Sequence, residues 1–188
     1  MALTIGVNYG FCAASPADDP AATNASIDNV AYVVRDTSPA GTNVITEVGW
    51  WCDNATEEAN FEVGLYASDG EGVPGEAGTL LYSEKTNAKG LDAGWKKRTG
   101  LNWAINPSTV YWIAVQLDNT DTTTNGNYTS SGGSGLDYIV GAATLPSQFE
   151  GGAIADADAK FGLYAVYEAA GGADALPMAM NHYRRLRS

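Results

Sequence analysis

Two short acidic motifs have the spacing best suited to binding a metal ion. Asp69 and Glu71 flank a glycine, and Asp156 and Asp158 flank an alanine, so each motif places two carboxylates two positions apart. Calcium accepts carboxylate oxygens from loops of this kind. Neither motif continues into the EF-hand pattern, and acidic residues in turns commonly bond their own backbone. Calcium binding and solvated turn residues therefore both remain open.

The residue types give little support to catalysis. The one histidine is His182, close to the C-terminal end, so residues 25–170 cannot supply a Ser-His-Asp or Cys-His arrangement. Acidic residues are numerous, but they fall mostly in turns rather than as a pair flanking a cleft. Cys12 and Cys52 lack metal-ligand spacing, and the sequence leaves open whether they pair or are buried thiols. We predict that the protein is not an enzyme.

Aromatic residues are the second class that could hold a ligand. The chain has 5 tryptophans and 10 tyrosines, and exposed rings can stack on the apolar faces of sugars. Trp50 and Trp51 are adjacent, so they point to opposite faces if they share a strand. Trp95 precedes the basic residues 96–98 in a Gly/Lys-rich segment that the pattern predicts to be a loop. We expect glycan contacts from Trp95, Trp51 and Tyr66, with core packing as the alternative for each ring.

Short β-strands must position these side chains. Apolar residues recur in about eight short, mostly alternating runs separated by Gly, Pro, Asp and Asn. No helical pattern of adequate length separates the runs, which disfavours a parallel α/β arrangement. The runs are IDNVAYVVRD, NVITEVGWWC, FEVGLYAS, TLLYSEK, LNWAI, VYWIAVQL, GLDYIV and FGLYAVYE. We predict an all-β fold, an antiparallel β-sandwich similar to a jelly roll.

The chain divides into three predicted parts. Residues 1–24 are an arm rich in Ala, Pro and Asp that could add an edge strand, and residues 25–170 form the sandwich. Residues 171–188 are a basic tail that could form a short helix. Within the sandwich, residues 118–135 are predicted to be a long polar loop. The candidate partner-docking residues in the tail are Tyr183, Arg184, Arg185 and Arg187.

Charge and hydropathy restrict the classes of partner. The formal net charge is -12, so the phosphates of a nucleic acid would be repelled. The bases at 96–98 either protect an edge strand from aggregation or contact an acidic partner or a charged glycan. No apolar run approaches the roughly 20 residues of a membrane span. The first residues have neither the basic region nor the long apolar region of a signal peptide. We expect no nucleic-acid and no membrane partner.

Five short motifs of the predicted sandwich form a recognisable series. They are Val63-Gly64-Leu65-Tyr66, Pro74-Gly75, Leu80-Leu81, Gly94-Trp95 and Tyr111-Trp112-Ile113-Ala114-Val115. This series resembles a class of bacterial and phage surface β-sandwiches. The resemblance covers about a third of the chain and is more specific for fold than for function. It implies a noncatalytic module of the carbohydrate-binding-like, adhesin or virion-decoration type, with an oligomer such as a trimer as the implied assembly.

These observations lead to two functional hypotheses. The first is a noncatalytic structural protein on a virion or extracellular surface, such as a capsid decoration or fibre protein. Its arm and tail would attach it to other virion or surface proteins or to further copies of itself. The alternative is a carbohydrate-binding module that uses exposed Trp and Tyr side chains and is assisted by calcium.

Overall fold

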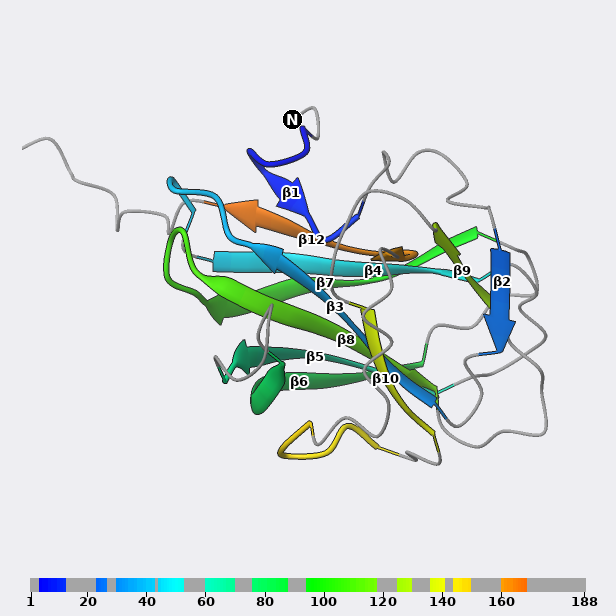
Figure 1. Cartoon of the computed structure of the whole chain (residues 1–188). Helices are drawn as coiled ribbons and strands as arrows, with labels where there is room; N and C mark the ends of the chain where they lie inside the picture. Colours follow the sequence, from blue (N-terminus) through cyan, green and yellow to red (C-terminus); the bar gives the residue numbers. More distant parts are fainter. Residues whose placement is uncertain are drawn as a thin grey trace, which may run out of the picture.

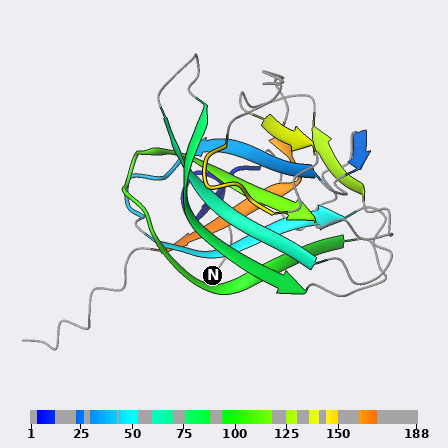
Figure 2. The same ribbon diagram turned by 90° about the horizontal axis from the view of Figure 1, so that it is seen from below.

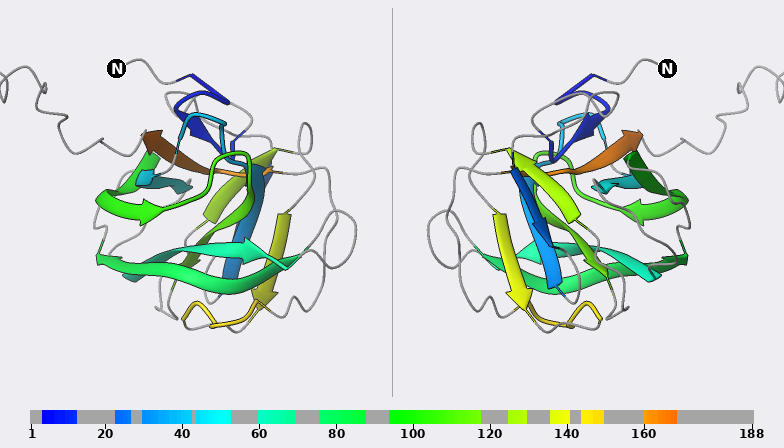
Figure 3. Two further views of the ribbon diagram at one scale, coloured as in Figure 1. Left: turned by 90° about the vertical axis from the view of Figure 1, so that its left-hand side faces the viewer. Right: turned by 90° about the vertical axis from the view of Figure 1, so that its right-hand side faces the viewer.

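The protein is an all-β antiparallel sandwich, which confirms the predicted fold class. Twelve strands and no helix are present among the residues that the computed structural model describes. Two large sheets lie face to face (Figures 1 and 3). The described residues are 4–12, 23–26, 30–42, 44–52, 60–69, 76–87, 94–117, 125–129, 136–140, 144–149 and 160–168.

The strand order differs strongly from the sequence order. The first sheet runs β1–β12–β4–β7, formed by Tyr9–Gly10, Leu163–Glu168, Val44–Cys52 and Gly94–Ala104. The second runs β10–β3–β8–β5–β6, formed by Leu136–Val140, Val30–Thr37, Val110–Leu117, Asn60–Ser68 and Ala77–Asn87. A small third sheet, β11–β9–β2, is formed by Lys160–Phe161, Asn125–Thr129 and Thr23–Ser26. Figure 2 shows the crossing of the strands from below.

All eight predicted runs form strands, but two predicted loops were wrong. Strand β7 begins at Gly94, so Trp95 and the bases at 96–98 lie on an edge strand of the first sheet. Residues 125–129, expected within a polar loop, form β9. Strand β9 is defined by backbone pairing with β2 and β11. Its sequence has no apolar alternation from which a strand could be predicted.

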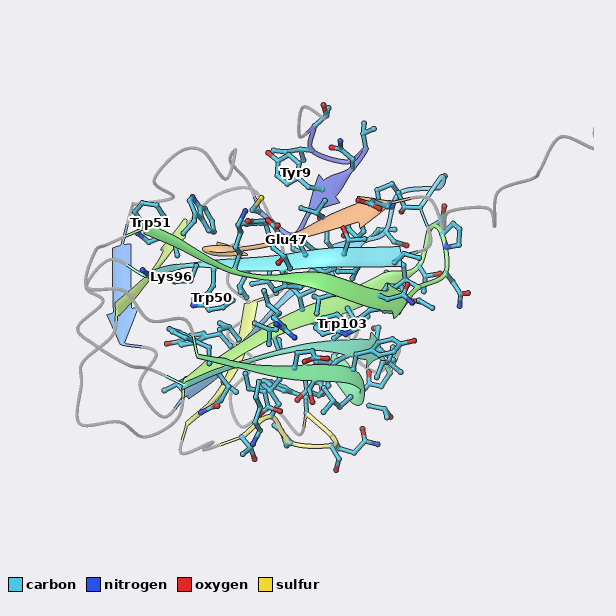
Figure 4. The ribbon with its side chains drawn as sticks, turned by 180° about the vertical axis from the view of Figure 1, so that it is seen from behind. Tyr9, Glu47, Trp50, Trp51, Lys96 and Trp103 are labelled. Carbon is cyan, nitrogen blue, oxygen red and sulfur yellow. The ribbon has the colours of Figure 1, made fainter. Side chains whose placement is uncertain are left out.

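The core lies between the two large sheets. Trp50 of β4 is fully buried and packs against Phe61 of β5, with ring centroids 4.7 Å apart. Figure 4 shows Trp50 and Trp103 between the layers. Burying one such large side chain stabilises the fold by about 1.5–3 kcal/mol.

A β-bulge corrects the predicted alternation along β4. Simple alternation places Ile45 and Trp51 on one face, opposite Val48 and Trp50. The pairing of β4 with β7 shifts register between Ile45 and Glu47, and Ile45 is fully buried together with Val48 and Trp50. The extra residue of the bulge resets the side-chain parity, so the core face of β4 cannot be obtained by counting residues.

Residues 9–12 of the expected arm are packed into the sandwich. Strand β1 pairs with β12, and Phe11 is 0% exposed in the core. The backbone N–H of Phe11 donates to Oδ2 of Asp36 at 2.7 Å. Phe11 has a φ of 70°, a conformation that costs energy for a residue with a side chain. The buried ring and the hydrogen bond to Asp36 hold the segment in place.

A short segment at residues 144–149 covers part of the outer face of the second sheet. The backbone N–H of Leu145 donates to Oε2 of buried Glu62 at 2.9 Å. The hydroxyl of Tyr66 donates to the carbonyl of Pro146 at 2.8 Å. Since a buried carboxylate needs hydrogen bonds to offset its desolvation, Glu62 fixes this segment to the sheet.

Replacing Phe11 tests whether the N-terminal segment belongs to the core. Phe11→Ala should lower the free energy of unfolding by about 3–5 kcal/mol, because it removes a buried ring and leaves a cavity. Ile5→Ala is the matched control in the same segment, since Ile5 is 47% exposed, and should change stability by about 0.5 kcal/mol or less. Urea unfolding measures both. Equal small effects would contradict the packing described for Phe11.

Candidate functional site

Three aromatic side chains meet on the outer face of the first sheet. We call Trp51, Trp95 and Tyr164 the outer aromatic cluster. The register places Trp51 of β4 opposite Trp95 of β7 and Tyr164 of β12 opposite Gly49 of β4. Because neighbouring residues of a strand point to opposite faces, Trp50 enters the core and Trp51 faces outward. Figure 4 shows Trp51 on the outer side of this sheet, with Trp50 between the layers.

Trp95 is the centre of this cluster. Its ring centroid lies 5.5 Å from that of Trp51 at an interplanar angle of 78°, and 5.1 Å from that of Tyr164 at 72°. Both contacts have the edge-to-face geometry that aromatic pairs favour. Trp51 and Trp95 are half-buried, whereas Tyr164 is 3% exposed. Two indoles therefore reach the surface, and Tyr164 is buried beside Trp95.

The Tyr164 ring lies very close to the backbone at Gly49. A Cβ added at Gly49 would overlap the Tyr164 ring, so the ring needs a glycine opposite it. Tyr9 and Cys12 are buried in contact with Tyr164, and Trp95 packs against the same group. The N-terminal segment and three strands of the sheet therefore build this site together.

A polar pair lies beside the aromatic cluster. The hydroxyl of Tyr164 donates to Oε1 of Glu47 at 2.6 Å, and Nζ of Lys97 lies 3.6 Å from Oε2 of Glu47. The side chains of Lys97 and Glu47 are 57% and 19% exposed. One oxygen of Glu47 thus accepts a hydrogen bond from the Tyr164 hydroxyl, and the other lies near the Lys97 ammonium group. The side chains of Glu47 and Lys97 both remain accessible to solvent.

Burial and charge determine the ionisation of the tyrosines. Burial raises the pKa of Tyr164 well above its ordinary value, and the hydrogen bond to Glu47 and the negative charge of Glu47 raise it further. Burial also raises the pKa of Tyr66, with a smaller contribution from Glu62. Both phenols are therefore protonated at neutral pH, and Tyr164 acts as a hydrogen-bond donor.

The structure brings two of the three predicted glycan-binding residues together and overturns the third. Trp51 and Trp95 are in contact, as described above. Tyr66 is 0% exposed and packs edge-on against Phe149, with centroids 5.3 Å apart, so it cannot stack on a sugar. The alternation of β5 does place Tyr66 on the outer face of its sheet. The segment 144–149, distant in sequence, covers that face.

One residue of the predicted calcium motifs can be located. Asp69 is exposed, and its Oδ1 accepts a hydrogen bond from the backbone N–H of Glu76 at 3.2 Å, which is the turn-closing role of such residues. Glu71, Asp156 and Asp158 lie outside the described residues. Among the described residues, no group of three His, Cys, Asp or Glu side chains is placed to hold a metal ion. Calcium binding stays a prediction.

Several other predicted features lie outside the described residues. They are the tail residues Tyr183, Arg184, Arg185 and Arg187 and the side chain of Cys52. Pairing between Cys12 and Cys52 therefore stays open. Over the described part of the chain, no helix is long and apolar enough to cross a membrane.

Comparison of the chain with protein-family models, with curated proteins and with solved structures found no match. The function therefore has to be argued from the geometry and chemistry of the site.

Sequence reasoning did not find Tyr164 and Glu47 as part of the site, and it considered Lys97 only as one of the three bases at 96–98, without linking it to Glu47. Each lies on a different strand, β12, β4 and β7, and only the register of the sheet joins them. Alternation within FGLYAVYE does indicate that Tyr164 points away from the face of Leu163 and Ala165. That signal could have placed Tyr164 on the outer face, but it gives no partner.

Stability should fall in alkaline solution because of the buried tyrosines. The pKa of Tyr66, Tyr164 and Tyr167 is raised above the ordinary value of 10.0, mainly by burial. Below that value the phenols are protonated in both states. Above it they ionise in the unfolded chain and stay protonated in the folded one, so the unfolded state binds fewer protons. Each tyrosine should remove about 1.4 kcal/mol per pH unit.

Urea unfolding between about pH 8 and pH 11 measures this dependence. Tyr164→Phe is the comparison variant, since it removes one of the three ionising groups and should make the decline with pH shallower by roughly a third. A stability that stays constant above pH 10 would contradict the burial of these hydroxyls.

Proposed function

We propose that the protein is a noncatalytic surface protein that binds carbohydrate through Trp51 and Trp95. The contact between these two half-buried indoles on the outer face of a sheet carries the proposal. The core lies on the other face of β4, where Trp50 serves it. Large apolar side chains that gather on an outer face commonly mark a binding surface.

The chemistry of the surface suits a sugar. A pyranose ring has an apolar face that can stack on an indole and hydroxyl groups around its edge that need hydrogen-bond partners. The exposed parts of Trp51 and Trp95 supply apolar contact area. Glu47 and Lys97 supply an acceptor and a donor on the same face of the sheet. Tyr164, protonated and bonded to Glu47, orients the carboxylate.

The spacing favours an oligosaccharide over a single sugar. Trp95 and Lys97 are two positions apart on β7, so their Cα atoms are about 7 Å apart. Trp51 pairs across with Trp95, and Lys97 pairs across with Gly49. The two indoles and the charged pair are therefore separated along the strands by a distance greater than the width of one pyranose ring.

The proposal includes attachment to a virion or to another surface, where the protein would act as a decoration or fibre component. Residues 9–12 of the arm are committed to the sandwich through β1 and Phe11. We therefore assign attachment to the tail at 171–188, whose formal charge is opposite to that of the rest of the chain.

Carbohydrate binding is tested by replacing the central indole. The full chain should bind selected oligosaccharides on an array that carries neutral and anionic glycans. Trp95→Ala should weaken binding of the best ligand by roughly 30-fold, which corresponds to about 2 kcal/mol for a tryptophan at the centre of an interface. Calorimetry with that ligand measures the change.

The matched control is Leu81→Ala, which removes an apolar side chain that is 43% exposed on β6 and lies outside the cluster. It should leave the affinity unchanged. Near-ultraviolet circular dichroism of both variants checks that the fold is retained. Unchanged affinity in folded Trp95→Ala, or an array without any ligand, would refute the proposed site.

A further inference from the structure

A groove near the N-terminus joins residues far apart in the sequence. It has a volume of about 710 Å³ and is lined by Gly6, Val7, Asn8, Pro39, Ala40, Gly41, Thr42, Tyr167 and Glu168. The groove lies where the turn before β1, the loop after β3 and the end of β12 meet, and its lining includes no residue of the outer aromatic cluster. Its lining is mainly apolar, and Glu168 is its one charged residue.

Both sides of the groove are closed turns. In one, the backbone N–H of Thr4 donates to Oδ1 of Asn8 at 2.6 Å, and that of Val7 donates to the carbonyl of Thr4 at 3.1 Å. In the other, both the N–H and the hydroxyl of Thr42 donate to the carbonyl of Pro39. Because internal hydrogen bonds define each turn, the groove is preformed.

Two apolar side chains of the turn before β1 are exposed to solvent, and one of them, Val7, lines the groove. Val7 is 59% exposed and Ile5 is 47% exposed. Among the described residues, Leu81 is the only other large hydrophobic side chain that is exposed. A fixed turn that presents two large apolar side chains to solvent has the character of an interaction surface.

The chain itself contains a segment that fits this surface. The last described residue, Glu168, is part of the groove wall, and residues 169–188 follow it. Among them are Leu176, Met178 and Met180, and three of the ten basic residues of the chain. Residues 171–188 carry one of the 22 acidic residues, so their formal charge is +2 while residues 1–170 carry -14. Apolar content and charge both favour docking of this tail on the body.

We infer that the groove binds the tail at residues 171–188 of a second copy of the chain, so that tail exchange assembles the protein. The position of Glu168, the last described residue before the tail, favours exchange. In each copy the described chain ends at Glu168 in the wall of the groove, with two residues between it and the tail. When two grooves come together, each tail therefore follows a residue that lies beside the groove of its partner. Reciprocal insertion then closes the assembly. This inference extends the proposed attachment through the tail and is independent of carbohydrate binding.

Light scattering tests the assembly on the full chain and on a chain that ends at Ala170. The full chain should have at least twice the monomer mass of 19.6 kDa, and the shortened chain should be a monomer. Val7→Lys combined with Ala40→Lys places positive charge in the groove and should also give a monomer. Leu81→Lys is the control at an exposed apolar position away from the groove and should leave the assembly intact.

A mixing experiment separates exchange from every other role of the tail. The shortened chain keeps the groove but has no tail, and the Val7→Lys, Ala40→Lys chain keeps the tail but has a blocked groove. Mixed in equal amounts, the two monomers should form a complex that neither forms alone. Met180→Ser together with Leu176→Ser in the tail should abolish it, whereas Ala179→Ser should not.

Several results would overturn the inference. They are a monomeric full chain, an oligomer that survives removal of the tail or blocking of the groove, and no complex between the two mixed chains. A monomeric full chain would leave the tail free to bind its own groove or another protein. Binding to the glycan array is measured on the same variants, so loss of assembly and loss of carbohydrate binding are distinguishable.

Discussion

The register of β4 between β12 and β7 is the constraint on which the rest of the structure depends. Because adjacent residues of a strand face opposite ways, one register places Trp50 in the core and Trp51 on the outer face. A slip by one residue would exchange them, burying the wrong indole and breaking its contact with Phe61. The bulge after Ile45 adjusts this register so that both ends of the strand contribute to the core.

The same register builds the candidate site. It brings Tyr164 over Gly49, where no side chain blocks the ring, and places Lys97 within reach of Glu47. The Tyr164 hydroxyl then holds Glu47 through a short hydrogen bond, and Trp95 packs against the Tyr164 ring in an edge-to-face contact. Core packing and the arrangement of the surface are therefore two consequences of one strand alignment.

The two outer faces of the sandwich differ in how far their aromatic side chains are covered. On the second sheet, Tyr66 and its neighbours are covered by residues 144–149, which Glu62 holds through the Leu145 N–H. On the first sheet, Trp51 and Trp95 remain half-buried. The cover on the second sheet shows that this fold can bury an outer aromatic ring, which makes the partly open indoles the stronger candidates for binding a ligand.

The sequence by itself determined the fold class and all eight main strands, because alternation and turn residues are local signals. It also singled out Trp51 and Trp95. It could not place Trp95 on a strand, because apolar and polar residues do not alternate along the whole of β7. Gly100, at a positive φ of 73°, lies within that strand. Only the tertiary structure decided that Tyr66 is covered and that Tyr164, Glu47 and Lys97 join the indoles. These outcomes depend on strand order and register, which are set by contacts between residues distant in sequence.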